Sequence, residues 1–153
     1  MKLSDTFTFD ADQDTVWQLL MDPAAIAKAM PGVDKLTPID GETNAWRANA
    51  RIGIAAVNGT YSGVVRLSEI TAPTQYRLTV NGEGQQSFIG GTALLTLHYD
   101  ADQKKTILNW DADANISGKL ASIAQRLVVA AASMLSKQFF RGIASQLPNA
   151  DKS

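Results

Sequence analysis

Few residues in this chain combine the types and the spacing that side-chain chemistry requires. His98 is its one histidine, and cysteine is absent from all 153 residues, which excludes thiolate catalysis, disulfides and cysteine-based metal sites. Asp111 and Asp113 stand two residues apart, so a strand would present both carboxylates on one face. Their alternation with Trp110 and Ala112 predicts an outward face, where charged residues are usually solvated. We expect the same outward position for His98.

The glycine-rich runs offer no substitute for an acid–base pair. Residues 82–84 (GEG) and 89–91 (IGG) lack the lysine and the serine or threonine of a phosphate loop, and neither run opens a helix. Serine and threonine are plentiful, but none shows a base with an orienting partner. The sequence therefore predicts no catalytic residue, no metal site and no covalent cofactor.

Composition predicts one soluble globular domain. The chain is 45% apolar and 19% charged, and 153 residues suffice to bury a core. A net charge of −1 and the lack of a basic run argue against nucleic-acid binding. Residues 1–12 show no apolar signal core, and no stretch reaches the roughly 18 apolar residues of a membrane span. We expect one domain over residues 1–147, a polar tail over 148–153 and a cytoplasmic location.

Hydrophobic periodicity predicts the order of the elements. A strand over residues 2–9 precedes two short helices, which end at Asp22-Pro23 and at Pro31-Gly32. From Lys35 onward, alternating apolar and polar residues indicate six further antiparallel strands, with Gly90-Gly91 among the turn signals between them.

A helical period replaces this alternation after Gly118. It predicts a long helix over about residues 119–146, which Pro148 ends. Because a curved sheet with one apolar face needs a cover, we expect this helix to lie against that face. The pattern predicts an α+β fold in which a seven-stranded antiparallel sheet wraps around the C-terminal helix.

Small residues occupy the middle of the predicted strands on the inner face, namely Ala48, Ala50, Gly63, Ala93, Ala112 and Ala114. Natural cores fill such space with larger side chains, so these positions either let the helix come close or leave a cavity. Large residues gather near the ends of the strands, which favours an apolar cavity suited to a flat or isoprenoid-like ligand. The predicted lining is Trp46, Ala48, Tyr61, Gly63, Leu78, Leu95, Trp110, Ala112, Leu127, Met134 and Leu135. Polar contacts to the ligand are expected from Tyr61, Tyr76, Tyr99 and Gln138.

Apolar residues also occupy predicted turns, which are normally polar. These turns indicate a pocket mouth that meets a membrane or a partner protein, or loops that fold over the pocket and are buried there. The predicted mouth consists of Met30, Pro31, Gly32, Ile54, Val57, Phe88 and Ile89.

An opening of strand, two short helices and a Pro-Gly loop resembles the START-like (polyketide-cyclase-like, SRPBCC) superfamily of helix-grip folds. Within it, the chain is most similar to the CoxG family, named for the G subunit of carbon monoxide dehydrogenase. This similarity rests on the DP…PG pattern of residues 22–32, NGTYSGVVRLSEI at 58–70, FIGGTALLTL at 88–97 and GKLASIAQRL…KQFF at 118–140. The resemblance implies the helix-grip strand order and ligand binding in an internal cavity.

The resemblance also implies a functional setting. It is that of a non-enzymatic accessory protein of a molybdenum hydroxylase such as carbon monoxide dehydrogenase, which binds a lipophilic, quinone-like ligand. Such a protein would link the enzyme to the membrane, with peripheral contact at its inner face. A cyclase- or hydrolase-type enzyme of the same superfamily and a chaperone-like assembly factor are the alternatives. An enzyme would need a titratable group with a shifted pKa inside the cavity, and the predicted inner faces offer only tyrosines and tryptophans.

Overall fold

A curved antiparallel sheet of seven strands organises residues 1–148, the part of the chain that this computed structural model describes. Its strand order is β1-β7-β6-β5-β4-β3-β2, so the first strand pairs with the last and β2 forms the other edge. The strands are β1 (Lys2–Phe9), β2 (Thr37–Pro38), β3 (Ala45–Ile52), β4 (Gly59–Thr71), β5 (Gln75–Gly84), β6 (Ser87–Asp100) and β7 (Lys105–Gly118).

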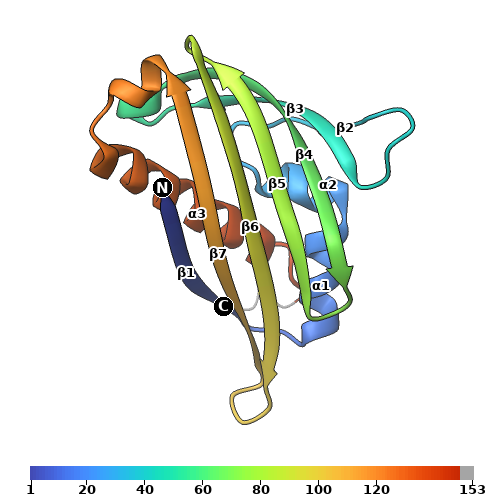
Figure 1. Cartoon of the computed structure of the whole chain (residues 1–153). Coiled ribbons are helices and arrows are strands. Elements are labelled where there is room, and N and C mark those ends of the chain that lie inside the picture. Colours follow the sequence, from blue (N-terminus) through green and yellow to red (C-terminus); the bar gives the residue numbers. More distant parts are fainter. Residues whose placement is uncertain (149–153) are drawn as a thin grey trace.

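The helices lie together on one side of this sheet, and α3 crosses it obliquely (Figure 1). They are α1 (Gln13–Met21), α2 (Pro23–Ala29) and α3 (Gln125–Ala144), with short 3₁₀ turns η1 (Ala55–Val57) and η2 (Lys119–Ser122). Aspartates begin the two short helices, because Asp12 accepts a hydrogen bond from the Thr15 amide at 3.0 Å and Asp22 accepts one from the Ala24 amide at 2.9 Å. This architecture confirms the predicted fold class. Residues 149–153, most of the predicted polar tail, lie outside the described residues.

One predicted turn is wrong. Gly90 and Gly91 lie inside β6, where they pair with Asn81 and Val80 of β5. The hairpin between these strands turns instead at Gln85 and Gln86, whose φ angles are +52° and +56°. Positive φ at both central residues suits the tight turn that joins right-twisted strands, so two glutamines form a turn that the sequence pattern assigned to glycines further on.

The predicted start of the long helix is also wrong, because α3 begins at Gln125 and not near Lys119. The chain first turns around the sheet through η2, which β6 holds in place: the Leu120 amide donates to the Ser87 hydroxyl at 2.7 Å. The buried face of α3 differs as well. Leu127 and Met134 are 47% and 49% exposed. The residues that α3 buries are Val128, Ala131, Phe140 and Ile143.

Aromatic packing explains this helix orientation. The ring of Phe140 lies 5.6 Å from Phe7, 6.4 Å from Phe9 and 6.5 Å from Trp110. These contacts fix the C-terminal half of α3 over β1 and β7 and close one end of the space between the layers. Packing of these rings supplies much of the driving force for this end of the fold.

Candidate ligand-binding site

The concave face of the sheet divides into a filled half and an open half. In the filled half, Tyr76, Leu95 and Trp110 form one cross-strand row and are 2%, 2% and 8% exposed. The neighbouring row pairs Ala93 with Ala112, and the next pairs Gly91 with Ala114. These small residues remain partly exposed although they face the helical layer, so water reaches this part of the concave face. Ala93 and Ala112 pack against the edge of the core cluster.

Helix α3 does not close this space by approaching the centre of the sheet. Its backbone lies nearest to α2, η1, β1 and α1. The tightest approach is to α2, since a Cβ added to Gly142 would lie 2.7 Å from the Ala29 Cα. The contacts of α3 with the sheet lie at β1 and at Trp110 of β7, where Phe140 packs, and not at the small residues in the middle of the sheet.

A pocket of about 740 Å³ lies between the loop after α2, β3 and α3. It contains Met30, Pro31 and Gly32 of the predicted mouth, and also Gln138, one of the predicted polar contacts. Its other lining residues are Lys28, Ala29, Val33, Asp34, Asn49, Ala50, Arg51, Thr60 and Gly142.

Backbone contacts fix the loop at this pocket. The Arg51 amide donates to the Gly32 carbonyl at 3.1 Å, and Val33 forms a bridge with Ala50. Gly32 has φ +74°, and a Cβ added there would lie 2.0 Å from the Arg51 carbonyl oxygen. Only glycine fits this left-handed, closely packed position, so the Pro-Gly signal in the sequence reflects the docking of the loop on β3.

The predicted lining residues divide among several environments. Trp46, Leu95 and Trp110 are buried in the core, while Leu127 and Met134 are exposed on α3. Those that remain partly buried are Ala48, Tyr61, Gly63, Leu78, Ala112 and Leu135. The residues that α3 does bury, Val128, Ala131, Phe140 and Ile143, are not in the predicted lining.

The three tyrosines differ in what they can offer a ligand. The Tyr61 hydroxyl donates to the Val57 carbonyl at 2.6 Å, and burial raises its pKa. Tyr76 is fully buried in the core, and burial raises the pKa of its hydroxyl more strongly. Tyr99 is 40% exposed at the end of β6. Tyr61 therefore holds the loop of η1 in place.

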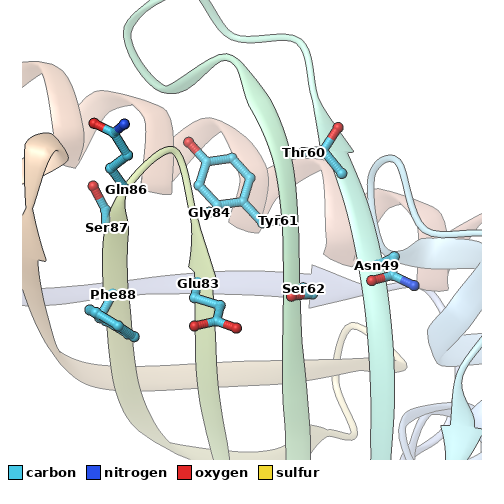
Figure 2. A pocket seen from close by; sticks show the side chains of 9 residues that line it. All are labelled: Asn49, Thr60, Tyr61, Ser62, Glu83, Gly84, Gln86, Ser87 and Phe88. Carbon is cyan, nitrogen blue, oxygen red and sulfur yellow. The ribbon is translucent and has the colours of Figure 1, made fainter.

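The predicted mouth residues do not all lie on one side of the sheet. Ile54 and Val57 are partly buried where η1 lies near α3, and Ile89 pairs with Gly82 on the concave face. Phe88 is 63% exposed and points to the convex face, because adjacent residues in a strand point to opposite faces. There it lines a second pocket of about 520 Å³ (Figure 2).

The histidine and the paired carboxylates lie off the concave face, as the sequence predicted. His98, Asp111 and Asp113 are exposed on strands β6 and β7 with their side chains on the convex face. Within residues 1–148, no group of three potential metal-ligating side chains comes together. No helix in this part of the chain is long and apolar enough to cross a bilayer.

Sequence reasoning missed the charged residues at the larger pocket, Lys28, Asp34 and Arg51. Lys28 and Asp34 flank the Pro-Gly loop, and their proximity to that predicted mouth was the available signal. Arg51 reaches the pocket because β2 pairs only as far as Arg47, and beyond it the Pro-Gly loop takes the edge of β3 through Gly32 and Val33.

The family model for CoxG, the G subunit of carbon monoxide dehydrogenase, matches residues 6–148. The chain belongs to this family. A crystal structure of a conserved protein from Geobacillus kaustophilus is 30% identical, covers 95% of this chain and 94% of its own, and superposes with a TM-score of 0.89. No curated protein matches the chain.

More distant structures show how widely the CoxG fold recurs. A START superfamily protein from Mycobacterium smegmatis is 12% identical over 95% of this chain and 96% of its own, with a TM-score of 0.72. Ara h 8.0201 is 14% identical over 95% of both chains, with a TM-score of 0.68. The fold is therefore START-like, and together with family membership it indicates a ligand-binding accessory role.

Proposed function

We propose that this CoxG family member is a non-enzymatic accessory protein of a molybdenum hydroxylase system of the carbon monoxide dehydrogenase type. It binds a lipophilic, quinone-like molecule between the sheet and α3. The observation that carries the proposal is the open half of the concave face, where Gly91, Ala93, Ala112 and Ala114 stay partly exposed beneath the helical layer.

The chemistry of this space suits an apolar, flat ligand. Its floor is the buried row of Tyr76, Leu95 and Trp110, and its wall is made of alanine and glycine. The adjoining pocket of about 740 Å³ is within the range of small-molecule sites. At that entrance the amide of Gln138 is a hydrogen-bond donor for a quinone carbonyl.

A link to the membrane follows from the residues around the entrance. Met30 and Pro31 line the pocket, and we propose that the partly buried Ile54, Val57 and Ile89 belong to the same apolar rim. A lipophile that leaves a bilayer through an apolar rim crosses little water. Each large side chain that the bilayer buries would contribute about 1.5–3 kcal/mol, which supports weak and reversible association.

Extraction of the purified protein tests ligand binding. We expect native mass spectrometry of protein from a quinone-producing host to show a bound lipophile, and organic extraction to release a quinone. Protein that carries no lipophile, and that takes up none from added decylubiquinone, would overturn the proposal in favour of an assembly factor. Turnover of an added lipophile by the protein alone would favour the enzyme alternative.

A further inference from the structure

The second pocket opens on the convex face of the sheet (Figure 2), and it shares Asn49 and Thr60 at the sheet edge with the larger pocket. We propose that it is a docking site for the guanidinium group of an arginine side chain on a partner protein. This inference goes beyond the proposed function, because it concerns the opposite face of the sheet and does not depend on a bound lipophile.

Strand register builds the pocket from one cross-strand row. Asn49 pairs with Ser62, Ser62 with Glu83, and Glu83 with Phe88. Paired residues share a face, with side chains about 5 Å apart at Cβ. Figure 2 shows these four side chains on neighbouring strands, on the side of the sheet away from α3. The row is therefore a rigid surface whose spacing the sheet fixes.

The row places an aromatic ring beside a carboxylate. Phe88 is 63% exposed, the largest value among the exposed large apolar residues of 1–148. Glu83 lies directly opposite it on β5. A ring face attracts a cation through its quadrupole, and a carboxylate binds a guanidinium through charge-assisted hydrogen bonds. Together they supply both interactions to one planar cation.

The charge and the hydrogen-bonding state of the lining favour a cation. Among the described residues that line the pocket, Glu83 is the one with a formal charge, and it takes part in none of the ion pairs found within 1–148. The hydroxyls of Tyr61 and Ser87 already bond to backbone groups. The arginines two residues before and after Asn49 on β3 are not among the lining residues.

Arginine fits this arrangement better than lysine does. A guanidinium is planar, stacks on an aromatic face and carries five N–H donors in a fixed fork. Glu83 accepts two of these donors, and the Ser62 hydroxyl is a further acceptor on the neighbouring strand of the same row. The ammonium group of lysine has neither the flat face nor the fork. Arginine is also enriched among the few residues that carry most of the binding free energy of protein interfaces.

An NMR titration of the full chain tests the proposal. The probe is N-acetyl-arginine amide, and its neutral isostere, N-acetyl-citrulline amide, is the control. We expect saturable shifts of the amides of residues 83 and 88 with the arginine probe, and at least about tenfold weaker binding in Glu83→Gln and in Phe88→Leu. Asp111→Asn, which removes another convex-face carboxylate, should bind as the wild type does.

Two outcomes would overturn the inference. One is equal binding of the arginine and citrulline probes, which would make the site insensitive to charge. The other is shifts that persist unchanged in both pocket variants. Because neither variant touches the concave face, both should retain the lipophile, which separates failure of this inference from failure of the proposed function.

Discussion

At the scale of single residues, two small residues on the concave face are small for different reasons. A Cβ at Gly63 would lie 2.5 Å from the Asn81 carbonyl oxygen and 3.0 Å from the Gly82 Cα, both backbone atoms of the adjacent strand. Ala112, by contrast, faces the open half, where it stays partly exposed. Close strand approach requires the glycine, whereas Ala112 is partly exposed at the edge of the core cluster.

We therefore expect opposite costs from enlarging these residues. Gly63→Ala should lower the free energy of unfolding by about 1–3 kcal/mol, as overpacking does. Ala112→Leu should change it by less than about 1 kcal/mol, because the added carbons enter empty space. Urea denaturation of both variants measures the difference. A loss at Ala112→Leu as large as at Gly63→Ala would mean that the open half is already full.

The buried Tyr76 should make the free energy of unfolding fall at high pH. Burial raises the pKa of its hydroxyl in the folded protein. Below the ordinary tyrosine pKa of about 10, this hydroxyl is neutral in both the folded and the unfolded protein, so it causes no loss of stability. Above it the unfolded chain loses a proton that the folded protein keeps, so stability falls by up to about 1.4 kcal/mol per pH unit. Urea denaturation between about pH 8 and about pH 11 should show a shallower fall for Tyr76→Phe. Equal slopes would contradict the assignment to Tyr76.

At the scale of elements, the contact between α2 and α3 sets the height of α3 above the sheet. Alanine is normally about 1 kcal/mol better than glycine inside a helix. At Gly142 we expect the reverse, because the new Cβ would lie 2.7 Å from the Ala29 Cα. Gly142→Ala should lower the thermal midpoint. The control is Ala130→Gly at an exposed position of α3, which shows the intrinsic helix preference alone. A stabilising Gly142→Ala would show that α2 and α3 separate easily.

Single substitutions can also show whether the loop of η1 or the hairpin of β5 and β6 contacts the membrane. If the concave rim meets the bilayer, Ile54→Asp should reduce co-sedimentation with liposomes several-fold, because it places a charge at the bilayer contact. Phe88→Asp should leave it unchanged, since Phe88 points to the convex face. Equal loss in both variants would indicate that the convex face, or both faces, contacts the lipid.

The sequence predicted elements with long, regular periods well and predicted their junctions less well. Alternation in β3, β4 and β7 identified the concave face, including the buried Trp46 and Trp110. The start and inward face of α3 could not be derived from the sequence, because they depend on Ser87 holding η2 and on Phe140 packing against β1. These contacts join residues far apart in the chain, so periodicity within α3 carries no information about them.

At the scale of the whole molecule, the fold separates a binding space from two outer surfaces. The aromatic cluster around Phe140 packs one end of α3 on the sheet, and the pocket beside Met30 and Gln138 is the entrance in our proposal. The convex face carries the exposed His98, Asp111 and Phe88. A protein built in this way can hold a lipophile on one face while it contacts a partner protein with the other.

Quenching of tryptophan fluorescence by decylubiquinone tests the central claim most directly, because Trp110 lies on the concave face in the row next to Ala93 and Ala112. We expect saturable quenching with one quinone per chain in the wild type, and loss of that quenching in Ala112→Leu. The matched control is Ala130→Leu, the same substitution on the exposed face of α3, which should quench as the wild type does. Undiminished quenching in Ala112→Leu, or equal loss in both variants, would contradict a ligand site between the sheet and α3.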